Sequence, residues 1–85
     1  MEDTNKFLPM LNYIVKKRNV PDLHSFTVRG MGKFAFIEAK YDKSIDIKVV
    51  DCNDEGKTQW YRNLSVPDAA RTLEELELDA DTIEM

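Results

Sequence analysis

The strongest fold signal lies in residues 25–51, whose sequence is SFTVRGMGKFAFIEAKYDKSIDIKVVD. Apolar and polar side chains alternate along three segments of this stretch, and a period of two is typical of β-strands. Gly30-Met31-Gly32 and Asp42-Lys43 interrupt the alternation and predict tight turns. The predicted strands are therefore residues 25–29, 33–41 and 44–51.

A fourth strand is predicted over residues 57–63, after the loop Asn53-Asp54-Glu55-Gly56. The glycine stands where such a hairpin loop needs a left-handed residue. Strands joined by connections this short pair antiparallel, so the four strands predict a meander.

An amphipathic helix is predicted on each side of the meander. Residues 6–17 carry apolar side chains at three- and four-residue spacing, with Pro9 in the first turn, where proline is tolerated. The second helix begins at Ser65, a good N-cap, and ends near Glu77. Two amphipathic helices and a sheet define the α+β class.

Charge is distributed unevenly along the chain. Residues 1–62 hold 11 of the 12 Lys and Arg residues and nine of the 16 acids, whereas residues 63–85 hold one Arg and seven acids. This dense acidic composition favours a flexible C-terminal tail over residues 79–85. The predicted fold is thus a single α+β domain over residues 1–78, with the order helix, four-stranded antiparallel meander, helix, and then the tail.

Composition excludes several classes of protein. With 85 residues there is room for one domain, and the single Cys52 excludes a disulfide framework within the chain. No apolar run approaches the roughly 20 residues of a membrane span, and Met1-Glu2-Asp3 does not begin a signal peptide, so a cytoplasmic protein without membrane contact is expected.

Catalysis, metal binding and cofactors are not predicted. His24 and Cys52 occur once each, without an orienting motif, and structural roles are favoured for both. Residues 51–56 begin like a calcium loop, but Arg62 stands where a closing bidentate Glu is needed, so a hairpin turn is favoured.

The aromatic residues of the strands allow two interpretations. Phe34 and Phe36 share one face of their strand, and core packing is the favoured interpretation because large apolar residues are scarce in a chain this short. Exposed rings flanked by Lys and Arg would instead be able to stack bases. Of Trp60 and Tyr61, only one can point into the core. Both faces of the second strand carry large apolar groups, so either the helices divide between the faces or one face meets a partner.

Two sets of candidate binding residues follow. Trp, Tyr and Arg are enriched at the energetic centres of protein interfaces, and the candidate protein-binding residues are Trp60, Arg62 and Tyr41. Cations contact phosphates, and the candidate nucleic-acid-binding residues are Lys16, Lys17, Arg18, Arg29 and Lys33.

These observations favour a small non-catalytic binding protein that inhibits or modulates a macromolecular partner, most simply a protein. In general character the chain resembles the small accessory proteins of phages and bacterial conflict systems, which act by binding. One alternative is an RNA-binding or single-stranded nucleic-acid-binding protein that uses the basic cluster and exposed aromatics. A second alternative is a homodimer without any other partner.

Overall fold

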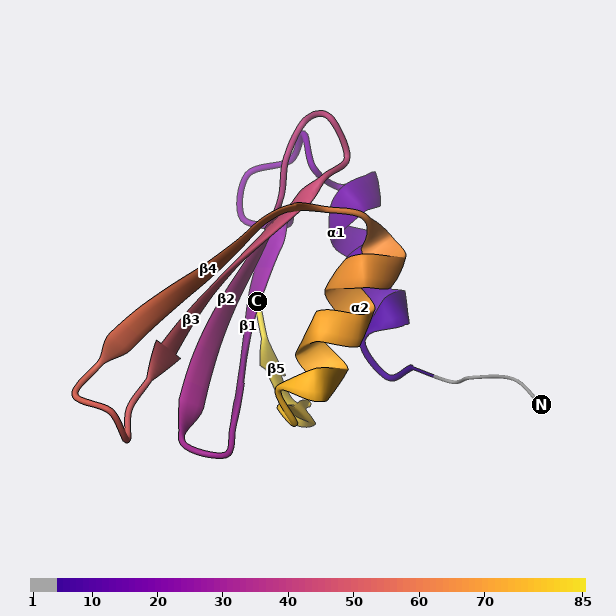
Figure 1. The fold of residues 1–85 in the computed structure, drawn as a ribbon. Coiled ribbons are helices and arrows are strands. Elements are labelled where there is room, and N and C mark those ends of the chain that lie inside the picture. Colours follow the sequence, from indigo (N-terminus) through magenta and orange to yellow (C-terminus); the bar gives the residue numbers. More distant parts are fainter. Residues whose placement is uncertain (1–4) are drawn as a thin grey trace.

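Five antiparallel strands form one sheet in the order β4-β3-β2-β1-β5, and two helices accompany it (Figure 1). The computed structural model describes residues 5–85, so the expectation for Met1-Glu2-Asp3 lies outside the described residues. The elements in chain order are α1 (Leu8–Lys16), β1 (Ser25–Gly30), β2 (Lys33–Ala39), β3 (Ile45–Asp51), β4 (Lys57–Leu64), α2 (Val66–Glu75) and β5 (Asp79–Glu84). The single compact α+β domain and its four-strand meander are confirmed.

Turn chemistry fixes the meander. Met31 and Gly32 adopt positive φ angles of 53° and 74°, as the tight β1–β2 turn requires. Between β2 and β3, the Asp42 carboxylate accepts hydrogen bonds from the hydroxyl and the backbone N–H of Ser44, which hold the pKa of Asp42 below its ordinary value. Gly56, with φ of 75°, closes the β3–β4 hairpin. Each predicted strand agrees with the structure to within two residues.

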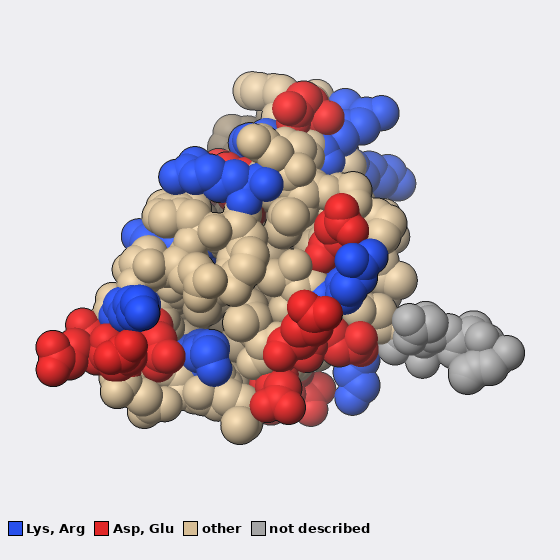
Figure 2. Space-filling view, in the orientation of Figure 1, with Lys and Arg blue, Asp and Glu red and all other residues tan. Residues whose placement is uncertain are grey.

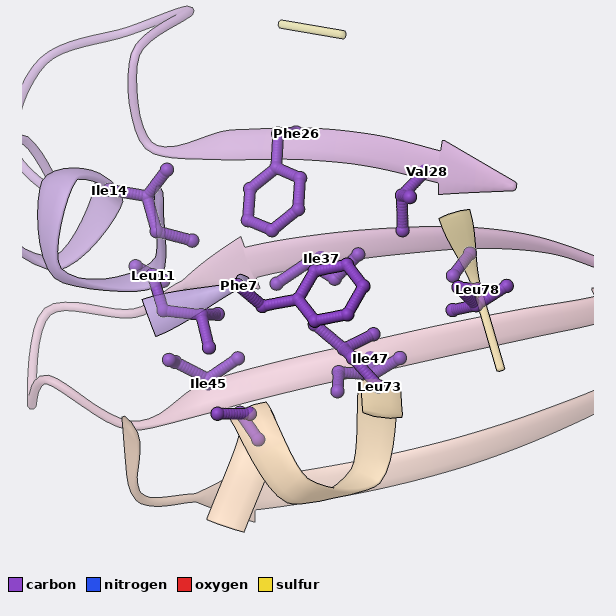
Figure 3. Close-up of a cluster of buried hydrophobic side chains, with 14 of the residues drawn as sticks. Phe7, Leu11, Ile14, Phe26, Val28, Ile37, Ile45, Ile47, Leu73 and Leu78 are labelled. Carbon is purple, nitrogen blue, oxygen red and sulfur yellow. The ribbon is translucent and has the colours of Figure 1, made fainter. Parts of the chain in front are cut away.

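Both helices cover the same face of the sheet (Figure 1). α1 packs on β2, α2 packs on β3 and β4, and the two helices contact each other. The core fills the space between them and the sheet, and its labelled side chains converge there from both layers (Figure 3). The sheet therefore keeps its second face free of helices within the described chain.

The start of α2 depends on its N-cap. The Ser65 hydroxyl accepts a hydrogen bond from the backbone N–H of Asp68 at 3.2 Å, and Pro67 occupies the first turn, where no N–H is needed. The helix then buries Ala69, Ala70 and Leu73. It ends at Glu75, two residues before the predicted end.

We expect Ser65→Ala to lower the free energy of unfolding by about 1 kcal/mol, because the N–H of Asp68 loses its acceptor. Urea denaturation would measure this difference. Ser65→Asp keeps an acceptor oxygen and should retain most of the stability; equal losses in both variants would contradict this role of the hydroxyl.

The prediction of a flexible tail is wrong, because residues 79–84 form β5, which pairs antiparallel with β1. Ala80 and Ile83 pack against the core, and Leu78 before them is buried. The Thr82 hydroxyl accepts a hydrogen bond from the N–H of Arg29 at 2.9 Å, and its own proton lies within reach of two carbonyl oxygens, that of Asp79 at 2.7 Å and that of Arg29 at 3.0 Å. The acids of this segment occupy the exposed positions of an edge strand, so their density does not imply disorder.

A close backbone approach accommodates β5. Gly30 has no side chain, and a Cβ at this position would lie 2.8 Å from the backbone nitrogen of Asp79. This separation is too short for real Cβ contacts. The glycine at the end of β1 thus permits the chain after α2 to reach the sheet.

Candidate functional site

The candidate site is the sheet face that carries no helix, called here the open face. Strand alternation assigns the side chains, because residues paired across adjacent strands share a face. The register pairs Phe36 with Lys48 and Lys48 with Trp60, and it pairs Phe34 with Val50 and Val50 with Thr58. The members of the open face on β1 to β4 are Ser25, Thr27, Arg29, Phe34, Phe36, Glu38, Asp46, Lys48, Val50, Thr58, Trp60 and Arg62.

Three aromatic side chains of the open face are exposed. Phe34 and Phe36 each retain 42% of their surface and Trp60 retains 47%. The favoured prediction that both phenylalanines belong to the core is wrong, because Ala35, Ile37 and Ala39 of the same strand face the helices instead. Tyr61 is the half-buried member of its pair with Trp60, so the tryptophan points to the open face.

Two cationic side chains, those of Arg62 and Lys48, lie against the Trp60 ring. The Arg62 guanidinium carbon lies 4.1 Å from the ring centroid, and the Lys48 ammonium lies 5.6 Å from it. Both distances fall in the range of cation–π attraction. Lys48 comes from the neighbouring strand and Arg62 from two residues along β4, so the ring is held from two directions.

Asp46 connects this cluster to the end of the sheet. Its carboxylate lies 3.8 Å from Arg62 Nη1 and 3.4 Å from Lys40 Nζ, and it accepts a hydrogen bond from the backbone N–H of Asn63 at 3.0 Å. The Asp46 side chain is only 12% exposed, so these partners satisfy a carboxylate that water scarcely reaches. The Asp46 carboxylate thus helps to hold the Arg62 guanidinium above the Trp60 ring.

We expect Arg62→Ala to move the fluorescence of Trp60 to longer wavelength and to increase its quenching by acrylamide, because the substitution uncovers the ring. Trp60 is the single tryptophan, so the signal has one source. Arg71→Ala, on α2, is the matched control and should leave the emission unchanged. Identical spectra for Arg62→Ala and the unmodified protein would contradict the stacked arrangement.

Charge on the open face is mixed rather than strongly positive. Arg29, Lys48 and Arg62 share it with Glu38 and Asp46, and the β5 residues Asp79 and Glu84 stand opposite Arg29 and Thr27. Elsewhere, acidic side chains gather over α2 and at the tip of the β3–β4 hairpin, and the surface between them is mostly uncharged with a few Lys or Arg side chains (Figure 2). The aromatic residues of the open face therefore have charged neighbours of both signs, and Lys48 lies between Phe36 and Trp60.

The predicted nucleic-acid residues divide between opposite ends of β2. Lys16 ends α1, and Lys17 and Arg18 follow it. Arg18 Nε donates to the Tyr41 carbonyl at 3.0 Å, just beyond the last residue of β2. Arg29 lies near the end of β1 and Lys33 is the first residue of β2, so the two residues flank the β1–β2 turn. A seven-residue strand separates the groups by about 20 Å.

The predicted protein-binding residues divide too. Trp60 and Arg62 contact each other on the open face. Tyr41 is 78% exposed in the β2–β3 connection, where it lines a shallow hollow with Arg18 and His24. The structure thus joins two of the three candidates and places Tyr41 beyond the paired strands.

His24 and Cys52 lie apart. His24 Nε2 is 3.4 Å from a Glu38 oxygen near the end of β2, whereas Cys52 donates its backbone N–H to Gly32 at the start of that strand. Asp51 ends β3 and residues 52–56 connect it to β4, as the hairpin interpretation predicts. Within residues 5–85, no group of three His, Cys, Asp or Glu side chains is arranged to hold a metal ion.

Sequence reasoning did not identify Lys48 and Asp46 as members of the site. The hairpin itself contains the information needed to find Lys48. If Asp51 pairs with Lys57 at the hairpin loop, each step away from the loop pairs the next two residues, and the third step pairs Lys48 with Trp60. Alternation along β3 then puts Asp46 on the same face.

Comparison with known proteins adds no assignment: no family model, curated protein or solved structure matches the chain. Neither helix in the described part of the chain has the length and apolar character needed to cross a membrane.

Proposed function

We propose that this is a small non-catalytic binding protein that modulates another protein by docking on it through the open face. The observation that carries the proposal is the group of three exposed aromatic rings on one helix-free sheet face, two on β2 and one on β4, with β3 between these strands. Large exposed aromatic side chains that gather on one face mark a binding surface more often than single scattered ones do.

Residue type supports a protein partner. Aromatic residues and Arg are enriched at the centres of protein interfaces, where water is excluded, and polar residues surround them. The open face carries these residue types, with Phe34 and Phe36 on β2, Trp60 on the edge strand β4, and charged residues of both signs among and around them. Arg62 is held by Asp46, so it would lose less conformational freedom on binding than an unrestrained arginine.

Charge argues against nucleic acid as the first choice. Nucleic-acid-binding surfaces are strongly positive because phosphate contacts dominate their affinity. Here Glu38 and Asp46 share the face with the cations, and Arg62 already lies over the Trp60 ring, where a base would otherwise stack.

One observation nevertheless favours single-stranded RNA as a second candidate. Phe34 and Phe36 lie two residues apart on the same face of β2, which places them about 7 Å apart. On the neighbouring strand β3, Phe34 pairs with the apolar Val50 and Phe36 pairs with the basic Lys48. Exposed rings on one strand are a platform on which successive bases can stack.

Two binding experiments separate these candidates. Immobilised protein should retain a specific protein from a nuclease-treated extract of its native cells, and a Phe36→Ser/Trp60→Ser variant should not retain it. Titration with a fluorescent single-stranded RNA at low and physiological salt should show no saturable binding. Tight binding that weakens steeply with salt would replace the protein partner with RNA.

A further inference from the structure

The two edges of the sheet differ in their capacity to pair with another strand. β5 is irregular, carries three acids in six residues, and uses the Thr82 side chain in place of ladder bonds to Arg29. Irregularity and charge are the devices by which proteins protect sheet edges. β4 contains no acid, Pro or Gly and has an uncharged centre from Thr58 to Tyr61. Its ladder with β3 shifts register between Ile45 and Ile47, beyond Tyr61, so the irregularity of β4 is confined to its C-terminal end.

The hydrogen-bond alternation shows which β4 groups face outward. Lys40 N–H donates to the Ser44 carbonyl and Cys52 N–H donates to the Gly32 carbonyl, so the even-numbered residues of β3 bond toward β2. The odd-numbered residues, Ile47 and Val49, then bond toward their β4 partners Tyr61 and Gln59. The backbone N–H and C=O groups of Thr58, Trp60 and Arg62 consequently point away from the sheet.

We propose that β4 pairs with β4 of a second copy of the chain, antiparallel about a two-fold axis at Trp60. The backbone hydrogen bonds between the two copies form only in registers that pair outward-facing residues with each other. The regular part of the strand ends at Asn63, whose φ is 59°. Centring on Trp60 uses the whole regular stretch: Trp60 pairs with its copy, and Thr58 pairs with Arg62 of the second chain.

This register is chemically compatible on both sheet faces. On the open face the two indoles meet at the axis, and Arg62 faces an uncharged threonine. On the helix face Gln59 lies opposite Tyr61 of the second copy. No like charges are opposed, which would otherwise destabilise a cross-strand pair. The two sheets become one continuous sheet, and their open faces lie side by side.

Sedimentation equilibrium over micromolar to millimolar concentrations tests the dimer, because a narrow strand-to-strand interface belongs to the weaker class of protein contacts. The mass should rise toward that of two chains. Thr58→Pro should be monomeric, since it removes an outward N–H without breaking a bond to β3. Thr58→Ala keeps that N–H and should dimerise. A monomer at every concentration, or a dimeric Thr58→Pro variant, would overturn the proposal.

Cross-linking tests the register without relying on proline. In a Cys52→Ser background, Trp60→Cys should form an intermolecular disulfide, because directly paired residues have Cα atoms about 5.5 Å apart. Thr58→Cys is the matched control, and it should not cross-link because the two copies of residue 58 lie about 13 Å apart. Cross-linking of Thr58→Cys but not of Trp60→Cys would exclude this axis. Either failure leaves the open-face proposal standing, because that proposal rests on the exposed rings of Phe34, Phe36 and Trp60 and not on the pairing of β4 with a second copy.

Discussion

Replacing Phe36 and Trp60 together with serine is expected to weaken partner binding by about 100-fold or more while the domain stays folded. Interface residues of this type commonly contribute about 2 kcal/mol or more each, and two such losses exceed a hundredfold change in the dissociation constant. Both side chains are more than two-fifths exposed, so their removal leaves no buried cavity. Binding to the captured partner would be measured by isothermal titration calorimetry.

Tyr41→Ser is the matched control for this variant. Tyr41 is the most exposed of the large hydrophobic residues in residues 5–85, yet it lies outside the open face, in the β2–β3 connection. Its substitution should leave the affinity unchanged. Equal losses of affinity in the Tyr41 variant and the open-face variant would place the interface at the loop end of the sheet instead.

Deleting residues 79–85 is expected to reduce the free energy of unfolding by about 2–4 kcal/mol. The deletion removes the apolar contacts of Ala80 and Ile83 with the core, and it leaves β1 without its second neighbour. Domains have only about 0.05–0.15 kcal/mol of stability per residue, so this is a large share of the total. Urea denaturation of the full chain and the shortened chain would measure it.

Single substitutions distinguish the stability contributed by the core contacts of β5 from that contributed by its charged side chains. Ile83→Asp places a carboxylate against the core and should reproduce much of the loss, whereas Glu84→Gln changes an exposed position and should cost less than about 0.5 kcal/mol. A shortened chain as stable as the full chain would show that β5 contributes nothing to the fold.

Local signals were sufficient to predict α1, α2 and the four-strand meander. Turn residues such as Gly32 and Gly56, and the Ser65 cap, act on their own neighbours, so the sequence around them identifies the element boundaries. β5 could not be found in this way. Its formation depends on the approach of residue 79 to Gly30, a contact between positions far apart in the chain.

The orientation of β2 was the second point that local reasoning missed. Both faces of this strand carry apolar residues, so alternation alone does not identify the buried face. Its register with β3 does, because Ile37 stands opposite Ile47, and the β3 strand has one apolar face, which must be buried. Phe34 and Phe36 are then left on the open face. The pairing of strands, rather than the pattern of one strand, therefore determines the site.

Fluorine NMR of Trp60 tests the central claim most directly. Incorporation of 5-fluorotryptophan labels this one position, since the chain contains a single tryptophan. Addition of the unlabelled partner protein should shift and broaden the fluorine signal, and the Tyr41→Ser variant should respond in the same way. A fluorine signal that stays unchanged while calorimetry shows saturated binding would contradict docking through the open face.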